Sequence, residues 1–294
     1  MILPPVIANH IEEWLSGATG RPVAIRSSVS LGGGCINNAL KILTSGGVFF
    51  IKYNLAATYP EMFRKEAMGL KILARTGEIR VPDVITAETT DKYDYLLLEY
   101  IDQGNMSHNF WEQFGSSLAA LHKHTQSFFG LDHDNYIGSL AQQNRKHAAW
   151  TEFFVLERLE PMVKMARNSG EVNQQTVNQF EFLYHRLENL IPAELPSLLH
   201  GDLWSGNYMV DEIGNPCIID PAVYYGHREV DLAMTRLFGG FPEAFYSGYH
   251  HAYPLENGWE QRPDIHNLYP LMVHVNLFGG GYISDVKRIL NRLT

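Results

Sequence analysis

The sequence LLHGDLWSGNYMV at residues 198–210, followed by CIID at residues 217–220, decides the fold class of this chain. It holds His200, Asp202 and Asn207 in the spacing H-x-D-x-x-x-x-N, and Asp220 closes the second apolar run. A turn-rich segment, DEIGNP, separates the two apolar runs, which predicts a β-hairpin. Asp202 would precede the first strand of this hairpin and Asp220 would follow the second. We therefore expect both carboxylates to face one cleft.

The spacing of these polar residues is that of a loop that catalyses phosphoryl transfer. Such transfer needs a carboxylate to take the proton of the attacking hydroxyl, and hard oxygen ligands for Mg²⁺. Asp202 is our candidate base, and the side-chain oxygens of Asn207 and Asp220 are our candidate Mg²⁺ ligands. The alternative is an ordinary turn at residues 200–202 and an ordinary cap at Asp220. Four positions in register, each on a suitable element, argue against that alternative.

Composition allows two lobes and argues against some partners. The chain has 294 residues, of which 45% are hydrophobic, so a large core is available. A formal net charge of -9 argues against binding to nucleic acid or to an acidic membrane. No run approaches the roughly 18 apolar residues of a membrane span, and the N-terminus lacks the plan of a signal peptide. With only Cys35 and Cys217 as thiols, we expect a cytoplasmic protein.

The first hundred residues read as a sheet with helices. Apolar spacing predicts a short lid helix over residues 4–16 and a main helix over residues 59–74. Strands are predicted at residues 23–31, 39–43, 48–52, 84–89 and 95–100. We expect these five strands to form one antiparallel sheet.

Three consecutive glycines, Gly32, Gly33 and Gly34, lie between the first two predicted strands. Glycines let the backbone approach a ligand closely, and their N–H groups suit phosphate oxygens. A plain hairpin turn is the alternative. A Rossmann site is excluded because a strand, and not a helix, follows the glycines.

Lys52 ends the third predicted strand, where it matches a lysine that pairs with phosphates. Glu66, on the following helix, is the candidate carboxylate that would fix the reach of Lys52, and Glu61 is its rival. A solvated surface position is the alternative for each of these side chains.

The last strand of the sheet becomes polar and reaches Gly104, after which helical patterns replace strand patterns. Backbone groups of Glu99, Tyr100 and Ile101 are our candidates for reading the adenine edge of a nucleotide. Helices are predicted at residues 110–124, 149–165, 172–190, 230–238, 242–253 and 265–293, with a break in the last one at residues 279–281. The spacing of the histidines matches no zinc pattern.

The chain resembles the fructosamine kinase, or ketosamine kinase, family, a relative of the aminoglycoside phosphotransferases and choline kinases. The resemblance is carried by LHGDLWSGN at residues 199–207, IDPA at 219–222, GHREVDLAM at 226–234 and LFGGF at 237–241, with the triple glycine, Lys52 and Glu66. It spans essentially the whole chain. It implies a bilobal α+β fold of the protein-kinase-like class. An ATP-binding lobe with an antiparallel sheet would cover residues 1–101, and a helical lobe with the acceptor site would cover residues 102–294.

The resemblance also implies an activity: an ATP-dependent kinase that phosphorylates the 3-hydroxyl of ketosamines, the sugar adducts of amines or protein lysines, in a deglycation repair role. Asp202 would be the base, Asn207 and Asp220 would hold Mg²⁺, and Lys52, oriented by Glu66, would contact the phosphates. Residues 99–101 would lie at the adenine. His-Gly-Asp replaces the His-Arg-Asp of protein kinases and Asp-Pro-Ala replaces Asp-Phe-Gly, so neither an activation-loop arginine nor a phenylalanine switch is expected.

Two further hypotheses concern single residues. Trp204 lies two residues from the candidate base, where an indole can pack on the C–H face of a sugar; a core anchor is the alternative. Cys35 lies in the glycine-rich loop, where its oxidation, or a bridge to a second chain, would impair ATP binding; an inert buried thiol is the alternative. The sequence leaves a monomer and a Cys35-linked dimer both open.

Two other functions stay open from the sequence. One is a kinase of another small hydroxyl acceptor, such as an aminoglycoside or a choline-like amino alcohol. The other is an ATP-binding pseudokinase that acts as an interaction module. The intact set Lys52, Asp202, Asn207 and Asp220 argues against the pseudokinase.

Overall fold

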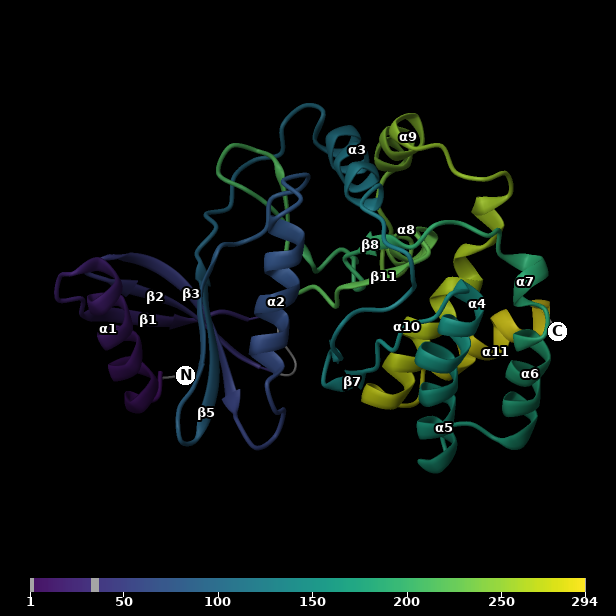
Figure 1. Ribbon diagram of the computed structural model, residues 1–294, viewed down its shortest axis with the longest axis horizontal. Coiled ribbons are helices and arrows are strands. Elements are labelled where there is room, and N and C mark those ends of the chain that lie inside the picture. The colour runs from purple at the N-terminus through teal and green to yellow at the C-terminus, as the bar shows by residue number, and fades with distance from the viewer. Residues whose placement is uncertain (1–2, 33–36, 294) are drawn as a thin grey trace.

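A five-stranded antiparallel sheet forms the N-terminal part of the protein, as the sequence predicts. The computed structural model describes residues 3–32 and 37–293. The strands are β1 (Ile25–Ser30), β2 (Asn38–Thr44), β3 (Gly47–Leu55), β4 (Val84–Thr89) and β5 (Tyr93–Glu99). Their order in the sheet is β1-β2-β3-β5-β4, which places β3 at the centre. The sheet and its helices lie beside a mostly helical part (Figure 1).

Two helices cover opposite faces of this sheet because side chains alternate along each strand. Helix α1 (Pro5–Thr19) buries Ile7, Ile11 and Leu15 against the face that carries Leu40 and Leu97. Helix α2 (Met62–Ala74) packs on the other face, together with Leu96 and Leu98. The expected lid helix is thus a full sheet-covering helix, since its apolar stripe repeats every four residues and is wholly buried.

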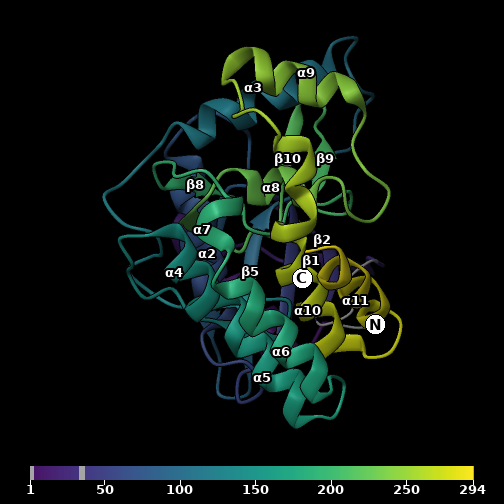
Figure 2. The same ribbon diagram turned by 90° about the vertical axis from the view of Figure 1, so that its right-hand side faces the viewer.

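The C-terminal part is helical. Its helices are α3 (Phe110–His122), α4 (Trp150–Phe153), α5 (Glu160–Asn168), α6 (Gln174–Tyr184), α7 (Leu187–Leu190), α8 (Glu229–Met234), α9 (Glu243–Ala252), α10 (Pro263–Phe278) and α11 (Tyr282–Leu293). Helices α3 and α9 pack together at one end of the molecule, and α5 and α6 lie at the other end (Figure 2). Two glycines allow the close contact of α3 and α9. A Cβ on Gly115 would lie 1.9 Å from the Phe245 carbonyl oxygen, and one on Gly248 would lie 2.3 Å from that of Glu112.

Several predicted helices are interrupted in the structure. A π-helical turn at Phe154–Leu159 separates α4 from α5, and the helix predicted at residues 172–190 is divided into α6 and α7. The break predicted near residues 279–281 is present between α10 and α11, and Gly279 there has φ 70°. Among the described helices, none is long and apolar enough to cross a membrane.

Short strand pairs connect these helices. The hairpin predicted from the opening stretch is present as β9 (Tyr208–Val210) and β10 (Pro216–Ile218). The sequence did not predict two other pairs. One joins β6 (Asn135–Ile137) to β7 (Leu140–Gln142), and the other joins β8 (Ser197–Leu199) to β11 (Tyr224–Gly226). Each of these strands has three residues, too few for a period to show in the sequence.

Candidate active site

Lys52 joins the two parts of the chain at one point. It lies on the central strand β3, in a buried run that helices cover on both faces. Its Nζ donates to Glu66 Oε1 at 2.9 Å and to Asp220 Oδ1 at 2.5 Å. Burial alone would lower the pKa of this lysine, but the charges of Asp220 and Glu66 outweigh burial and raise the pKa. Lys52 is therefore charged, and it contacts the two carboxylates that the sequence singled out.

Glu66, and not its rival Glu61, reaches Lys52. Glu61 precedes α2 with φ 59° and lies at the surface, 3.6 Å from Arg64. Helix α2 also contacts the segment that follows Asp220. A Cβ on Gly69 would lie 3.2 Å from the Val223 side chain, so a glycine permits the close approach. The helix that carries Glu66 thus packs directly on the segment that carries Asp220.

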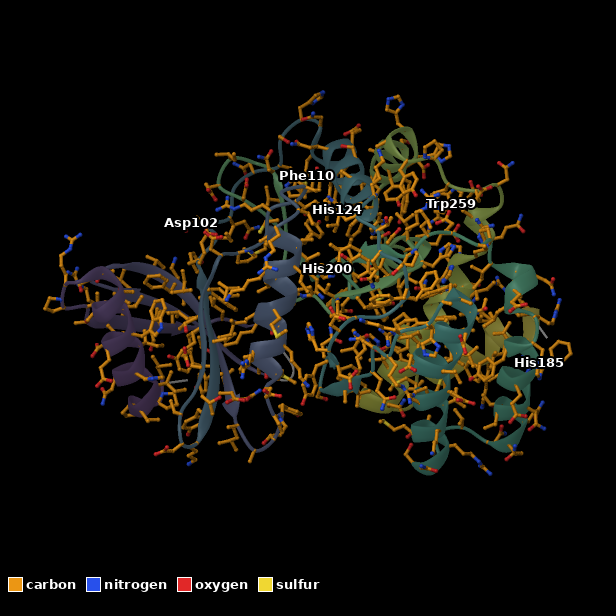
Figure 3. All side chains as sticks on the ribbon, viewed as in Figure 1. Asp102, Phe110, His124, His185, His200 and Trp259 are labelled. Atoms are coloured by element: carbon orange, nitrogen blue, oxygen red, sulfur yellow. The ribbon has the colours of Figure 1, made fainter. Side chains whose placement is uncertain are left out.

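The catalytic loop turns at Gly201, for which the structure gives a reason. Gly201 has φ 83°, and a Cβ there would lie 2.1 Å from the Ala222 carbonyl oxygen. A side chain such as the arginine of protein kinases does not fit. The buried His200 ring fixes the loop, since its Nδ1 accepts from the Asp202 N–H at 3.2 Å and its Nε2 donates to the Ile219 carbonyl at 2.9 Å. His200 lies in the middle of the molecule (Figure 3).

Asp231 on α8 anchors this loop, a role that the sequence did not reveal. Its fully buried carboxylate accepts the N–H groups of His200 at 2.8 Å and Gly201 at 2.9 Å. His122 on α3 lies 3.2 Å from the same carboxylate. Burial alone would raise the pKa of Asp231, but the hydrogen bond from His122 and the backbone donors lower it. The only available signal was that Asp231 belongs to the GHREVDLAM stretch.

Asp202 and Asn207, the candidate base and a candidate metal ligand, contact each other in this loop. Asn207 Nδ2 donates to the Asp202 carbonyl at 2.8 Å and to Asp202 Oδ2 at 3.0 Å. Burial raises the pKa of Asp202 well above its usual range, and the charge of Asp220 adds to this effect. A carboxylate with a raised pKa is a better proton acceptor near neutral pH.

The oxygens near Asp202 suit a hard divalent cation. Because Asn207 uses its amide nitrogen toward Asp202, its Oδ1 is left for another ligand. The Asp220 side chain is 43% exposed, and its residue holds φ 56°, in the left-handed region. Carboxylate and amide oxygens are the ligands that Mg²⁺ takes. The donor set of Asn207 and Asp220 therefore fits this metal.

A second group with metal-ligand side chains lies elsewhere among the described residues. His227, Glu229 and His266 are buried, with ligand atoms within 4.8 Å of one another. Both carboxylate oxygens of Glu229, however, accept from Arg262, at 2.7 and 2.5 Å. We assign this group as an ion pair of the core. His122 is likewise a core residue, hydrogen-bonded to Tyr249 at 2.8 Å.

The candidate adenine segment follows β5. The Glu99 N–H already donates to the Asp83 carbonyl at 2.9 Å, and its carboxylate accepts from Arg80 at 2.7 Å. Among the described residues, the N–H groups of Tyr100 and Ile101 have no backbone acceptor. These two amides are therefore better placed than that of Glu99 to bind a ligand.

The glycine-rich loop is only partly described. A Cβ on Gly32 would have no neighbour within 4 Å, so the backbone is open there. Gly33, Gly34 and Cys35 lie outside the described residues, so the predictions on them stay predictions.

The other thiol, Cys217, is buried in β10, and burial raises its pKa to about 12.

Trp204 lies on the catalytic loop within a group of aromatic rings. Its indole covers Gly206, where a Cβ would lie 2.4 Å from the ring. The ring of Phe238 meets it edge-on at 6.1 Å, and Phe238 in turn lies 4.7 Å from the ring of His274 on α10. Trp204 and Phe238 are both partly exposed. Part of the indole is thus accessible at the surface, so contact with a sugar stays a prediction.

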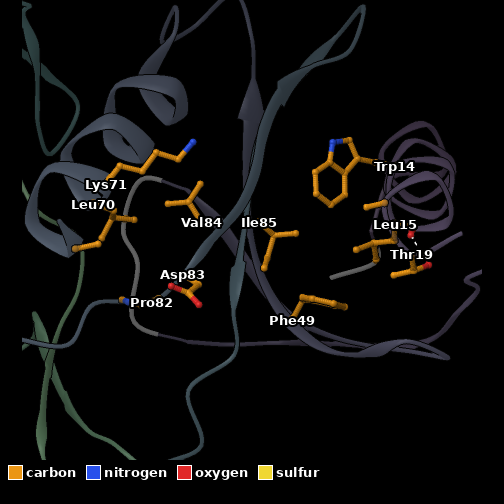
Figure 4. A pocket seen from close by; sticks show the side chains of 12 residues that line it. Trp14, Leu15, Thr19, Phe49, Leu70, Lys71, Pro82, Asp83, Val84 and Ile85 are labelled. Atoms are coloured by element: carbon orange, nitrogen blue, oxygen red, sulfur yellow. Dashed lines mark hydrogen bonds between the residues drawn. The ribbon is translucent and has the colours of Figure 1, made fainter. Parts of the chain in front are cut away.

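Two grooves among the described residues lie away from this site. One groove of about 550 Å³ lies between α1, α2 and β4 (Figure 4). A second groove, of about 570 Å³, is lined by residues of α2 together with His124 and Tyr225. Of the described candidate site residues, none lines either groove. The candidate site is instead defined by the polar contacts of Lys52, Asp202, Asn207 and Asp220.

Comparison with known proteins assigns the family. The model of the family described as fructosamine kinase matches residues 7–294. The chain belongs to the fructosamine kinase family. A probable ketoamine kinase of Synechocystis is 41% identical over 98% of this chain and 97% of that protein. The chloroplastic protein-ribulosamine 3-kinase of Arabidopsis thaliana is 39% identical, covering 96% of this chain and 87% of the relative.

Solved structures agree with this assignment. The crystal structure of a putative fructosamine-3-kinase from Haemophilus somnus superimposes with a TM-score of 0.87, at 29% identity and 96% coverage of each chain. The aminoglycoside phosphotransferase APH(4)-Ia gives a TM-score of 0.59 at 12% identity, again over 96% of each chain. The predicted α+β, kinase-like fold is thus confirmed.

Proposed function

We propose that this protein is an ATP-dependent kinase that phosphorylates the 3-hydroxyl of ketosamines, free or on protein lysines. The observation that carries the proposal is the convergence of Lys52, Glu66 and Asp220, which are far apart in sequence, beside Asp202 and Asn207. Membership of the fructosamine kinase family and likeness to a protein-ribulosamine 3-kinase support the choice of acceptor.

Lys52 is the residue proposed to bind the phosphates of ATP. Its ammonium is held between Glu66 and Asp220, and phosphate oxygens would join this set of acceptors. Glu66 keeps the ammonium in place while the nucleotide binds and leaves. Tyr100 and Ile101 would offer backbone groups to the adenine, and Gly32 to Gly34 would cover the phosphates. This division assigns residues 1–101 to the nucleotide lobe and residues 102–294 to the acceptor lobe.

Asp202 is the residue proposed to act as the general base. It would accept the proton of the acceptor hydroxyl as that oxygen attacks the γ-phosphorus of ATP, and ADP leaves. The raised pKa of Asp202 favours this transfer. Asn207 holds the Asp202 carboxylate through its amide, so the base enters the reaction already oriented.

Asn207 and Asp220 are the residues proposed to hold Mg²⁺. When bound, Mg²⁺ would neutralise charge on the phosphate oxygens. Asp220 is suited to this task because its side chain is the most exposed of the ionic trio with Lys52 and Glu66. The left-handed backbone at Asp220 sets the direction in which the carboxylate leaves the chain.

Trp204 is the residue proposed to contact the sugar of the acceptor. The partly exposed indole lies two residues from the base, and aromatic faces pack well on apolar faces of sugars. The ring of Phe238 extends the same surface.

The proposal is tested by incubating the protein with ATP, Mg²⁺ and a panel of ribulosamines, fructosamines and aminoglycosides. Phosphorus and proton NMR would locate the new phosphate. We expect one equivalent of ADP for each ketosamine 3-phosphate formed. Phosphorylation of aminoglycosides alone would change the acceptor class. Lack of ATP consumption with every acceptor would favour a pseudokinase and overturn the proposal.

A further inference from the structure

A buried network of amide side chains lies beneath the segment that follows Asp220. It is built on the β6–β7 hairpin, from Asn135, Gln142 and the nearby Asn144. Each of these side chains is at most 6% exposed. Asn135 Oδ1 accepts from Gln142 Nε2 at 2.8 Å and from Asn144 Nδ2 at 2.9 Å. The hairpin thus presents a fixed set of donors.

The donors of this network are aimed at two backbone carbonyls. Asn135 Nδ2 donates to the Val223 carbonyl at 2.9 Å, and Gln142 Nε2 donates to the Ala222 carbonyl at 3.2 Å. Ala222 and Val223 follow Asp220 by two and three residues. The Ala222 N–H, in turn, donates to the His200 carbonyl at 2.9 Å. One residue therefore ties the hairpin, the Asp220 segment and the catalytic loop together.

Two further side chains, both from the helical part of the protein, donate hydrogen bonds to the network. Tyr269 on α10 donates its hydroxyl to Gln142 Oε1 at 2.8 Å. Arg158, which lies in the π-helical turn and is fully buried, donates to Asn144 Oδ1 at 2.7 Å. The Arg158 guanidinium also stacks over the Tyr224 ring at 4.0 Å. Buried networks in which each amide has partners keep a single arrangement.

The hairpin also contacts the N-terminal part of the protein. The hydroxyl of Tyr136 on β6 donates to the Pro60 carbonyl at 3.0 Å, just before α2. The ammonium of Lys65 on α2 lies 5.3 Å from the centre of the Tyr136 ring. On the far side, Gly69 of α2 packs on Val223. The hairpin thus lies against both the helix that carries Glu66 and the segment that carries Asp220.

We propose that the β6–β7 hairpin is a positioning element for the metal-binding carboxylate, with Gln142 and Asn135 as its positioning residues. Through hydrogen bonds to the carbonyls of Ala222 and Val223, these amides fix the position of Asp220 relative to Lys52 and Asn207. The inference rests on the proposed function, because it takes Asp220 to be a metal ligand. Residues that hold a metal ligand in place typically change metal affinity about 10–100-fold when they are altered.

The test measures metal binding apart from turnover. Mn²⁺, a paramagnetic substitute for Mg²⁺, is titrated into the full-length protein with ADP and followed by electron paramagnetic resonance. Gln142→Met keeps the size of the side chain and removes its donors. We expect Mn²⁺ affinity to fall about tenfold, with faster hydrogen exchange at residues 219–225. Tyr269→Phe removes only one hydroxyl, and we expect a fall of about threefold, the effect of a weaker hydrogen bond.

Two matched variants control for a merely structural role. Asn276→Leu removes a half-buried amide that donates to the Met162 carbonyl at 3.0 Å, away from the Asp220 segment. Tyr246→Phe removes a buried hydroxyl that lies 3.0 Å from Thr235 Oγ1. We expect each control to lower the melting temperature about as much as its partner variant while it leaves Mn²⁺ affinity unchanged.

The outcomes separate this inference from the proposed function. Unchanged Mn²⁺ affinity in Gln142→Met, or an equal fall in the controls, overturns the positioning role. If Gln142→Met does not fold, Tyr269→Phe against Tyr246→Phe decides in the same way. Asp220→Asn serves as the reference. Full Mn²⁺ affinity in Asp220→Asn would instead overturn the metal assignment on which the inference rests.

Discussion

The phosphate side and the acceptor side of the proposed site are built from different interactions. On the phosphate side, Lys52 contacts Glu66 and Asp220 through ion pairs of 2.9 and 2.5 Å, and the Lys52 side chain is buried. On the acceptor side, Trp204 and Phe238 meet through ring contacts at 6.1 Å and stay partly exposed. Ionic contacts require defined distances, whereas apolar ring faces tolerate changes of shape. We therefore expect changes on the phosphate side to affect turnover and changes on the acceptor side to affect the choice and KM of the sugar.

The largest effect is expected from Asp202→Asn. The variant keeps the size of the side chain but cannot accept the proton of the hydroxyl, so kcat should fall about 10²–10⁴-fold. Steady-state kinetics with a ketosamine acceptor and a melting curve measure this. A near wild-type kcat would show that Asp202 is not the general base, and it would contradict the expected difference between the phosphate side and the acceptor side.

The second-largest effect, a loss of stability, is expected when the ion pair of Glu229 and Arg262 outside the site is broken. Burial alone would raise the pKa of Glu229, but hydrogen bonds from Arg262 lower it from 4.5 to about 2. A carboxyl whose pKa is lowered on folding adds stability above its unfolded pKa, and this stability is lost as pH falls toward the folded pKa. A lowering of this size corresponds to about 3 kcal/mol of stability at neutral pH.

Glu229→Gln should therefore lower the free energy of unfolding at pH 7. Its stability should also depend less on pH between 4.5 and about 2 than that of the wild type. Urea unfolding at several pH values measures this. We expect a normal kcat in the folded variant, because this ion pair, unlike that of Lys52, lies outside the site. An unchanged unfolding free energy would contradict the assigned role of Glu229.

Asp231→Asn tests the anchor beneath the catalytic loop. The two carboxylate oxygens of Asp231 accept hydrogen bonds from the N–H groups of His200 and Gly201. The amide of asparagine has one oxygen, so it can accept only one of these two hydrogen bonds. We expect a loss of about 1–3 kcal/mol in unfolding free energy, since one buried donor is left without an acceptor. The kcat should fall as well, while KM for the sugar stays the same. A fall in sugar affinity alone would place Asp231 on the acceptor side.

The smallest effect is expected from Trp204→Leu. Loss of the indole face should raise KM for the ketosamine about tenfold, about 1.4 kcal/mol, because the sugar would lose the burial of its apolar C–H face against the ring. KM for ATP and the melting temperature should stay close to wild type. An unchanged ketosamine KM in a folded variant would show that the indole does not contact the sugar.

How much the sequence predicted depends on whether the signal was local. The five strands of the sheet and the β9–β10 hairpin were predicted, because their apolar runs and turn residues lie within a few positions. The direct contact of Lys52 with Asp220 was not predicted. The pairing of Lys52 with Glu66 was predicted, because a strand-end lysine followed by a helix with a carboxylate matches a phosphate-pairing lysine and its partner. These are the features that short stretches of sequence carry.

The features that the sequence did not predict depend on very short strands or on contacts between residues far apart in the sequence. The strands β6, β7, β8 and β11 have three residues each, and the last two pair across residues 197–226. Asp231 acts through backbone N–H groups 30 and 31 residues earlier, for which a single sequence gives no spacing rule. Gly201 was seen as a departure from His-Arg-Asp. Its cause is the Ala222 carbonyl oxygen, which would lie 2.1 Å from any Cβ at that position, and only the three-dimensional structure reveals this contact.

The central claim is that Lys52, Asp202, Asn207 and Asp220 share one nucleotide site. A crystal structure with a non-hydrolysable ATP analogue and Mg²⁺ tests it most directly. We expect Mg²⁺ about 2.0–2.1 Å from oxygens of Asn207 and Asp220, with Lys52 Nζ on a phosphate oxygen and Asp202 facing the γ-phosphate. A nucleotide bound away from Lys52, or a metal held without Asn207 and Asp220, would contradict the account.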